Sequence, residues 1–363
     1  MARLKVGLIF GGKSGEHEVS LTSAFFIYNA LDKKKYEIIL IGIDKQGIWH
    51  TGGAKELWIN PGKTEVTRLN KKNPEITAVN KKGKVYLIDL KSGKNITDID
   101  VFFPITHGTF GEDGCLQGFL EFLGAAYVGP GVLGSAVGMD KDVMKKLFRD
   151  AGLPIGKFYT LRDGEKNNLA LIIKDLKFPI FVKPANLGSS VGVSKARDKK
   201  ELAKAIKVAF QYDTKIVLEE NLKGREIECS VLGNEKPIAS IPGEIKLKSD
   251  FYSYDAKYIS PDAATPVPRA ELSQKIIKQV QKAAVKVFKV LNCEGMGRVD
   301  FFLTSRGLYV NEINTLPGFT SVSMYPKMFA ESGIPYPKLL DKLIQFGMER
   351  KKRSDKLKRD FKS

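Results

Sequence analysis

The chain is 363 residues long and carries 59 Lys and Arg against 41 Asp and Glu, a formal net charge of +18. This length exceeds what one hydrophobic core supports and predicts two or three domains. Hydrophobic residues make up 43% of the chain, which excludes a wholly disordered, collagen-like or coiled-coil chain. No apolar run reaches the roughly 18–20 residues that span a bilayer. The three cysteines lie far apart, which favours a reducing cytosol.

The excess of positive charge allows two interpretations. A strongly basic protein can bind nucleic acid or an anionic membrane, or it can simply have a well-solvated surface. The lysines are dispersed along the chain, which favours the second. Aromatic residues fall mostly within apolar runs instead of among surface lysines, which weighs against a nucleic-acid-binding protein. The one dense basic stretch, residues 349–363, is expected to be a flexible tail.

Residues 1–140 alternate predicted strands and helices. Strands are expected over 5–10, 37–43, 101–105 and 126–128, and helices over 19–31 and 116–123. The first strand runs into glycines instead of a cleavage site, so we expect a buried strand here and not a signal peptide. The alternation predicts an open, mostly parallel sheet with function at the carboxyl ends of its strands. Residues 44–98 are polar and rich in lysine, and are expected to form an insertion of hairpins or loops.

Two smaller α+β units are expected after residue 140. The unit at 141–226 has a helix over 140–151, strands over 179–184, near 194 and over 216–220, and a helix over 201–210. The strand near Ser194 is expected to end there. The unit at 227–348 has strands around 227–233 and 238–245, a polar aromatic loop at 248–266, a helix over 271–291, a hairpin at 299–313 and a closing helix over 334–347.

Two glycine patterns suggest phosphate binding. Residues 129–134 match G-x-G-x-x-G, the fingerprint of dinucleotide sites. The match comes late in the alternating domain and has Pro130 in its turn, so a dehydrogenase is not favoured. The stronger candidate is the Gly/Ser loop at 188–192, after a strand that ends near Lys183. Its glycines allow backbone N–H groups to approach phosphate, although an ordinary hairpin turn explains this loop equally well.

The hairpin within 298–314 carries the strongest signal. A three-residue loop at 305–307 sets Asp300 opposite Glu312, and the two-residue period of a strand places Asn314 on the same face. Burying such carboxylates is costly without compensation, and magnesium that bridges nucleotide phosphates provides it. A solvated sheet face is the alternative. Acidic residues where the chain leaves the strand at 216–220, beginning with Glu219, suit ribose or adenine, although charged turns are also common on surfaces. Together these segments indicate ATP and magnesium without a P-loop.

Six motifs in order resemble the D-alanine–D-alanine ligase family of the ATP-grasp superfamily. They are Gly11-Gly-x-Ser-x-Glu-x-Glu-Val-Ser20, His107-Gly-x-x-Gly-Glu-Asp-Gly-x-Leu-Gln-Gly118, Met139-Asp-Lys141, Gly188-Ser-Ser-Val-Gly192, Phe251-Tyr-x-Tyr-x-Ala-Lys-Tyr258 and Glu312-Ile-Asn-Thr-x-Pro-Gly-Phe-Thr320. The resemblance runs from residue 7 to about 345. It implies an N-terminal open parallel-sheet α/β domain followed by a two-subdomain ATP-grasp fold, with a mobile loop at 248–266.

The resemblance also implies roles for single residues. Those that bind ATP are Lys141 and Lys183 at the α- and β-phosphates, Glu219, Leu222 and Glu226 around adenine and ribose, Lys257 at the γ-phosphate, and Ser190. Those that hold two Mg²⁺ or Mn²⁺ ions are Asp300, Glu312 and Asn314. Glu16 would hold the ammonium of the first D-alanine, and His107 would lie near the same substrate. Arg298 and Gly318 would stabilise an oxyanion, and Ser323 would receive the second carboxylate. Glu16, Ser189 and Tyr258 resemble a hydrogen-bonded triad that latches the loop over the site.

The reaction implied by the family is ATP-dependent joining of two D-alanines through D-alanyl phosphate, with release of ADP and phosphate, for peptidoglycan precursors. The resemblance further implies a cytoplasmic bacterial enzyme, commonly a homodimer, with no nucleic-acid partner. Tyr258 favours D-alanine over D-lactate as second substrate, and D-serine stays an alternative. Leu187 stands where some relatives carry Glu, which removes one polar contact.

Overall fold

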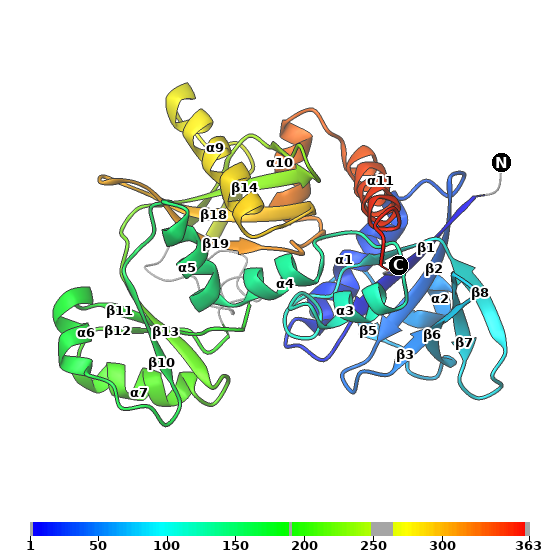
Figure 1. The fold of residues 1–363 in the computed structure, drawn as a ribbon, viewed down its shortest axis with the longest axis horizontal. Helices are drawn as coiled ribbons and strands as arrows, with labels where there is room; N and C mark the ends of the chain where they lie inside the picture. Colours follow the sequence, from blue (N-terminus) through cyan, green and yellow to red (C-terminus); the bar gives the residue numbers. More distant parts are fainter. Residues whose placement is uncertain (1–2, 189–190, 248–263, 360–363) are drawn as a thin grey trace.

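The computed structural model describes residues 3–188, 191–247 and 264–359. Three main sheets of seven, four and six strands organise these residues. The sheet of the N-terminal part and the sheet of the central part lie at opposite ends of the molecule, and the third sheet lies between them (Figure 1). This arrangement agrees with the predicted α/β domain followed by two α+β units.

The N-terminal sheet has a parallel centre and an antiparallel extension. Strand β1 (Leu4–Gly11) pairs in parallel with β2 (Tyr36–Ile43) and β9 (Val101–Pro104). The insertion contributes the short elements β3 (Trp49–Thr51), α2 (Ala54–Leu57), β4 (Trp58–Ile59), β5 (Arg68–Leu69), β6 (Glu75–Lys81), β7 (Lys84–Asp89) and β8 (Asn95–Ile99). Strands β3, β6, β7 and β8 join the main sheet in antiparallel pairs, so the hairpins expected there are confirmed. The strand expected at 126–128 is only a bridge between Tyr127 and Phe102.

The start of helix α1 (His17–Ala30) depends on a tight turn after β1. Gly11 has a φ of +89°, and a Cβ atom there would lie 2.1 Å from the carbonyl oxygen of Ile43, so this position requires glycine. The turn brings the first glycine motif to the carboxyl end of β1, as expected for an open parallel sheet. Helices α3 (Cys115–Phe122) and α4 (Val132–Met139) complete this part of the chain.

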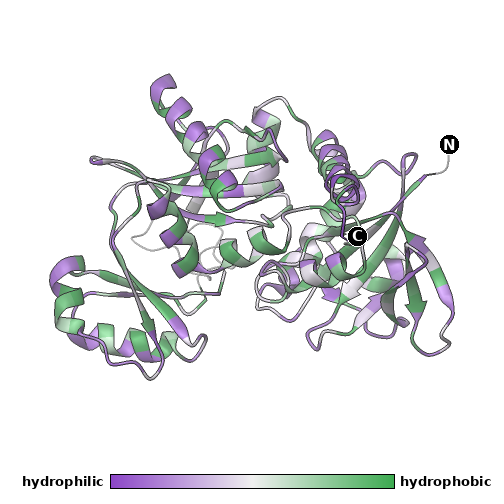
Figure 2. Cartoon of the chain, in the orientation of Figure 1, coloured by the Kyte–Doolittle hydropathy of each residue, from purple (hydrophilic) through white to green (hydrophobic). Residues whose placement is uncertain are grey.

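The central sheet has the order β10-β13-β11-β12. Its strands are β10 (Phe158–Arg162), β11 (Ile180–Pro184), β12 (Ser194–Ala196) and β13 (Lys215–Glu220). The strand expected to end near Ser194 begins there instead. Helices α6 (Leu169–Leu176) and α7 (Lys199–Ala209) contribute to a separate apolar core with one face of the sheet, which leaves the other face for a ligand. Figure 2 shows polar and apolar residues side by side on these two helices, as on helices at a protein surface.

Helix α5 (Lys141–Asp150) belongs by packing to a different unit from the strands that follow it. The side chain of Asp140 caps the helix by accepting hydrogen bonds from the amides of Asp142 and Val143. Its buried Met144 and Phe148 lie in the core of the C-terminal sheet. The domain boundaries near residues 140, 226 and 348 therefore stay a prediction.

The C-terminal sheet is covered on one face by helix α9 (Gln274–Val290). Its strands are β14 (Arg225–Gly233), β15 (Ile238–Ala239), β16 (Gly243–Leu247), β17 (Ala264–Val267), β18 (Gly295–Thr304) and β19 (Gly307–Asn314). The loop expected at 248–266 lies outside the described residues except for its last three, which belong to β17.

The β18–β19 hairpin pairs Asp300 with Glu312 as predicted, but its turn and register differ from the prediction. Its turn is tighter than expected, because Thr304 already pairs with Gly307. A β-bulge after Asp300 then leaves Asn311 as an extra residue, which restores the pairing of Asp300 with Glu312. The two differences from the predicted register therefore cancel at the carboxylates.

Helix α11 (Tyr336–Ser354), after α10 (Met324–Glu331), connects the C-terminal end of the chain to the N-terminal sheet (Figure 1). One core contains residues of β1, β9, α1 and α11. At Gly347 a Cβ atom would lie 2.6 Å from the carbonyl oxygen of Tyr127. The flexible tail predicted from residue 349 is wrong for its first part, because the helix continues to Ser354 and Arg350 is buried. No helix in the described part of the chain is long and apolar enough to cross a membrane.

Replacing Arg350 by alanine should lower the free energy of unfolding by about 2–3 kcal/mol. The guanidinium of Arg350 donates to the carbonyl oxygens of Gly129 and Tyr127 and lies 4.0 Å from the centre of the Tyr127 ring. Those carbonyls lose a charged donor in the variant. Urea unfolding measures the change, and the exposed Lys352→Ala is the control on the same helix. Equal stability of the two variants would show that the buried contacts of Arg350 do not stabilise the fold.

Candidate active site

A cavity of about 890 Å³ lies where the three parts of the chain meet. All predicted site residues within the described part line it: Glu16, His107, Lys141, Lys183, Glu219, Leu222, Glu226, Arg298, Asp300, Glu312, Asn314, Gly318 and Ser323. Ser189, Ser190, Lys257 and Tyr258 lie outside the described residues. Segments separated by up to 300 residues in the sequence thus form one site.

The floor of the cavity is a polar face of the C-terminal sheet. Cross-strand pairing aligns Glu228, Asp300 and Glu312 in one row, and Ser230, Arg298 and Asn314 in the next. The intervening residues Cys229, Val299 and Ile313 point to the opposite face and lie in the core beneath α9. The two-residue period of the strands therefore separates a charged face from an apolar face on the same three strands.

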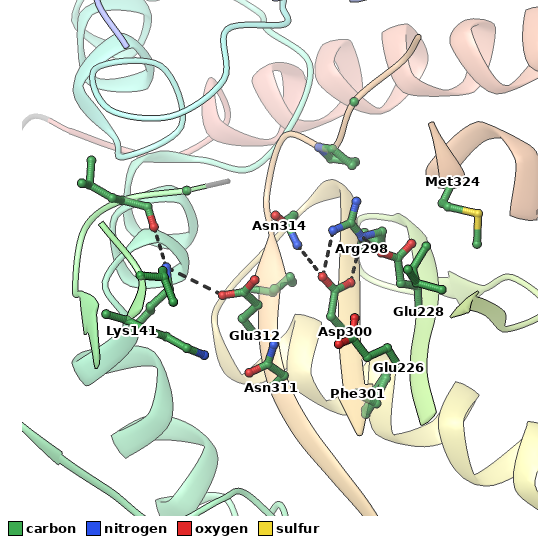
Figure 3. A pocket seen from close by; sticks show the side chains of 18 of the residues that line it. Lys141, Glu226, Glu228, Arg298, Asp300, Phe301, Asn311, Glu312, Asn314 and Met324 are labelled. Carbon is green, nitrogen blue, oxygen red and sulfur yellow. Dashed lines mark hydrogen bonds and ion pairs between the residues drawn. The ribbon is translucent and has the colours of Figure 1, made fainter. Parts of the chain in front are cut away.

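Arg298 is at the centre of this charged face (Figure 3). Its Nε and one terminal nitrogen each donate to an Asp300 oxygen at 2.8 Å, and Nε lies 3.3 Å from Glu228 Oε1. Burial alone would lower the pKa of Arg298, but the carboxylates of Asp300 and Glu228 raise it well above its ordinary value. The guanidinium is therefore a permanent positive charge held by two carboxylates.

The same face fits a divalent metal by the chemistry of its donors. Asp300 and Glu312 are paired carboxylates on neighbouring strands, and the Asn314 amide donates to Asp300 Oδ2 at 3.0 Å. Hard oxygen ligands of this kind suit Mg²⁺, which keeps further positions for water and phosphate. Within the described residues no group of three or more His, Cys, Asp or Glu side chains forms a metal cluster. The predicted set has two carboxylates and one amide, Asp300, Glu312 and Asn314.

Two lysines share one carboxylate on the opposite wall. Glu219 Oε2 accepts from Lys183 Nζ at 2.9 Å, and Glu219 Oε1 lies 3.3 Å from Lys145 Nζ. Burial would raise the pKa of Glu219, but the two ammonium groups hold it at about 2. Burial lowers the pKa of Lys145, whereas the carboxylates of Glu219 and Glu312 outweigh burial and raise the pKa of Lys183. Lys183 is thus a firmly charged group facing the cavity.

Lys141 bridges this wall and the metal-binding face. Its Nζ donates to the carbonyl oxygen of Leu187 at 2.6 Å and lies 3.7 Å from Glu312 Oε2 (Figure 3). It begins helix α5, whose cap fixes the direction of the first turn. Two lysines, Lys141 and Lys183, therefore face the predicted metal ligands from the central side, which is the arrangement that a polyphosphate requires.

The N-terminal part contributes a cluster of three titratable side chains. Glu16 lies against the glycine loop, because a Cβ atom at Gly188 would be 2.8 Å from Glu16 Oε2. Burial lowers the pKa of His107, so the ring is neutral near pH 7. Burial and the nearby Glu16 raise the pKa of Glu112 to about 8, although its Oε1 accepts the Gly108 amide at 2.8 Å. Glu112 is therefore protonated near neutral pH.

Replacing Glu112 by glutamine should make the protein relatively more stable as the pH rises. The folded wild type keeps the Glu112 proton up to about pH 8, whereas the unfolded chain releases it near 4.5, the ordinary pKa of a glutamate. The stabilising effect of the raised pKa is full below 4.5 and is lost as pH rises through 8. Urea unfolding of both proteins from pH 5 to 8.5 measures this. A pH-independent difference would contradict the raised pKa.

The turn after Asn314 closes the site. Gly318 lines the cavity, and a Cβ atom there would be 2.7 Å from Ser323 Oγ. Ser323 Oγ accepts from the Thr320 amide at 2.9 Å and shares a hydrogen bond with the Thr320 hydroxyl. A small residue is therefore needed at position 318 so that the turn can fold back on Ser323.

The sequence interpretation missed three charged or polar groups in this site. Lys145 lies one helical turn after Lys141 on the same face, a spacing that could have revealed it. Glu228 lies two residues after Glu226 on a strand, so it faces the same side. Glu112 belongs to a motif that was recognised, but its sequence gave no sign of its burial. By contrast the G-x-G-x-x-G match at 129–134 leads into α4, with Gly131 as the residue before the helix, and does not form part of a nucleotide-binding βαβ unit.

Comparison with known proteins follows the same division of the chain. The family model described as the D-ala D-ala ligase N-terminus matches residues 5–130, and the one described as the D-ala D-ala ligase C-terminus matches residues 147–345. A D-alanine–D-alanine ligase of Oceanobacillus iheyensis is 49% identical over 357 residues, 98% of each chain.

Solved structures agree with this similarity. The D-alanine–D-alanine ligase of Coxiella burnetii matches with a TM-score of 0.85 and 38% identity, over 98% of this chain and 97% of that one. The VanG D-Ala:D-Ser ligase of Enterococcus faecalis matches with a TM-score of 0.83 and 36% identity, over 95% and 100%. The Bacillus anthracis D-alanine–D-alanine ligase complexed with ATP matches with a TM-score of 0.73 and 31% identity, over 98% and 100%.

Two α+β units that face each other across a nucleotide-sized cavity, after an open α/β domain, define an ATP-grasp enzyme. The fold expected from the sequence is confirmed. The chain belongs to the D-alanine–D-alanine ligase family.

Proposed function

We propose that this protein joins two D-alanines to D-alanyl-D-alanine at the expense of ATP, through a D-alanyl phosphate, for peptidoglycan precursors. The main support for this proposal is that two lysines, two acidic metal ligands and Arg298 converge around one cavity. A cavity of about 890 Å³ is of the size of small-molecule sites. A relative that was solved with ATP supports ATP as the co-substrate.

ATP would lie between the central and C-terminal sheets. Lys141 and Lys183 would contact its phosphates, and the segment from Glu219 to Glu226 would surround adenine and ribose. Lys183 would have to leave Glu219 Oε2, which it contacts at 2.9 Å, to reach a phosphate. Lys145 stays beside Glu219 and keeps this carboxylate charged for the nucleotide.

The first step transfers the γ-phosphoryl group to the carboxylate of the first D-alanine. Catalysis of this step depends on positioning and on neutralising the charge of the phosphates. Mg²⁺ or Mn²⁺ held by Asp300, Glu312 and Asn314 would supply Lewis-acid neutralisation, and two such ions are expected. Lys183 and Arg298 add fixed positive charge from the protein. Glu16 would hold the ammonium of the first D-alanine near the glycine loop.

In the second step the amine of the second D-alanine attacks the acyl phosphate, and phosphate leaves. A tetrahedral oxyanion develops, which Arg298 and the amide of Gly318 would stabilise. Ser323 would bind the second carboxylate. The proposed roles of Ser189, Ser190, Lys257 and Tyr258 rest on the family resemblance alone. Closure of the site over the acyl phosphate would exclude water and prevent its hydrolysis.

D-Alanine is the favoured second substrate. The family resemblance at Tyr258 supports it, and so does the name of the relative that shares 49% of its residues with this chain. The similarity to a D-Ala:D-Ser ligase at 36% identity is lower. A cytoplasmic location would give the enzyme access to ATP, and a homodimer is expected by analogy with the family. Sedimentation of the purified protein tests the dimer.

Phosphate release from ATP and Mg²⁺ tests the function. We expect turnover only when D-alanine is present, with D-alanyl-D-alanine and ADP formed in equal amounts. Pairing D-alanine with D-serine or D-lactate measures the selectivity for the second substrate. Absence of D-alanine-dependent turnover would reject the proposed function. Nucleic acid should not affect the rate, which separates this function from that of a basic nucleic-acid-binding protein.

A further inference from the structure

The turn at 315–319 is held by side chains from the N-terminal part of the chain. The ring nitrogen His107 Nδ1 lies 3.0 Å from the carbonyl oxygen of Leu316, and the Leu316 amide donates to Glu112 Oε2 at 3.4 Å. The Phe319 amide donates to Ser23 Oγ at 3.3 Å. All these contacts are buried. The turn is thus fixed on both sides by groups that lie about 200–300 residues earlier in the chain.

The fixed groups surround one backbone amide that is not used by the protein. Pro317 has no N–H group, and the amide of Gly318 makes no hydrogen bond within the ranges that the structure describes. Gly318 lines the cavity. The Gly318 amide is therefore a donor that a bound molecule can use, and its direction depends on how Leu316 and Phe319 are held.

The contacts of His107 and Ser23 determine which atom donates and which accepts in each hydrogen bond. A carbonyl oxygen only accepts, so the bond to Leu316 requires the proton of the ring on His107 Nδ1. In the neutral ring Nε2 is then an acceptor, and Ser23 Oγ lies 3.2 Å from it. The Ser23 hydroxyl donates to His107 Nε2, and its oxygen accepts the Phe319 amide. Both ring nitrogens of His107 are occupied, and burial keeps the ring neutral.

We propose that Ser23 and His107 are a positioning pair that orients the Gly318 amide toward the oxyanion of the second step. This inference rests on the proposed function. His107 then acts on the turn instead of on the first D-alanine, and Ser23 contributes without contacting either substrate. The two residues bind Leu316 and Phe319 from the N-terminal part, so the domain that would bind the first amino acid also sets the geometry of the oxyanion donor.

Kinetics of Ser23→Ala test the proposal. The change removes one buried hydroxyl, and we expect kcat for dipeptide formation to fall about tenfold with the KM for ATP unchanged. Ser20→Ala is the matched control: Ser20 is also fully buried on α1, accepts the Gly11 amide at 2.7 Å and donates to the carbonyl of Ile105 at 2.6 Å. It should lose stability but keep kcat within twofold. Equal losses of kcat in the two variants, or an unchanged kcat in Ser23→Ala, would overturn the proposal.

Nitrogen NMR provides a readout that does not depend on turnover. The chain has only three histidines, so ¹⁵N-labelled imidazole signals can be assigned with His107→Gln as reference. We expect a proton on Nδ1 of His107 at pH 7 and a change of the Nε2 signal in Ser23→Ala. A proton on Nε2, or a charged ring, would overturn the inference even if D-alanine-dependent turnover is found. An inactive wild type with the expected tautomer would instead reject the proposed function.

Discussion

Arg298→Met should lower kcat for D-alanine-dependent phosphate release by about 100- to 1000-fold, the cost of losing one preorganised donor at an oxyanion. The side chain that replaces the guanidinium has a similar length but neither charge nor donors. Asp300 and Glu228, which are cross-strand neighbours, would face each other without the cation between them. The unfolding free energy should therefore also fall, by about 3–5 kcal/mol. Steady-state kinetics and urea unfolding measure the two effects.

Arg298→Lys separates the two contributions of this residue. Lysine keeps the positive charge between Glu228 and Asp300 but cannot form the two parallel bonds of 2.8 Å to Asp300. We expect most of the stability to return and kcat to stay at least tenfold below that of the wild type. If Arg298→Lys recovers full activity, charge alone is sufficient and the fork geometry is not part of catalysis.

Glu312→Gln should raise the Mg²⁺ concentration that gives half-maximal activity at least tenfold, and lower kcat at saturating Mg²⁺. The change removes one of only two carboxylates in the predicted ligand set and leaves an amide oxygen, which is a weaker ligand for a hard cation. Lys141 Nζ, 3.7 Å from Glu312 Oε2, also loses its acidic neighbour, so ATP affinity without metal should not fall. Mg²⁺ titration of activity and of nucleotide binding checks both statements.

Glu331→Gln is the matched control for that experiment. Glu331 is exposed at the end of α10 and forms a distant ion pair of 3.9 Å with Arg269. The same loss of charge there should leave the Mg²⁺ dependence unchanged. An Mg²⁺ dependence of Glu312→Gln that equals that of Glu331→Gln would remove Glu312 from the metal site.

Most of the fold could be predicted from local signals. Patterns of neighbouring residues predict three of its elements: the buried strand at 4–11, the capped helix after Asp140 and the alternating strands of the hairpin. The packing of α5 could not be predicted. Its apolar residues Met144 and Phe148 could pack against the central or the C-terminal sheet, and only the folded structure shows that they lie in the core of the C-terminal sheet. The helical extension to Ser354 was missed for a similar reason. From the sequence alone Arg350 is predicted to belong to a solvated basic tail, because its partners, the carbonyls of Tyr127 and Gly129, lie more than 200 residues away in the chain.

The residues of the candidate site could be predicted where they belong to short sequence motifs. The pairing of Asp300 with Glu312 followed from strand periodicity, although a tighter turn and a bulge after Asp300 replaced the expected loop. Contacts between distant segments had no such signal. Nothing in the sequence around Ser23 or His107 shows that they meet at the turn of Leu316 and Phe319, because this contact exists only after three parts of the chain have packed together.

The shared core of the first strands and the last long helix also determines when the chain can finish folding. Strand β1 and helix α1 are synthesised before their apolar partners Leu340, Leu343 and Ile344, which follow them much later in the chain. Until then one side of the first sheet stays exposed to water and to other nascent chains. The N-terminal domain should therefore become resistant to protease only after helix α11 has been made, whereas the central sheet, whose core ends at Leu218, can fold before then.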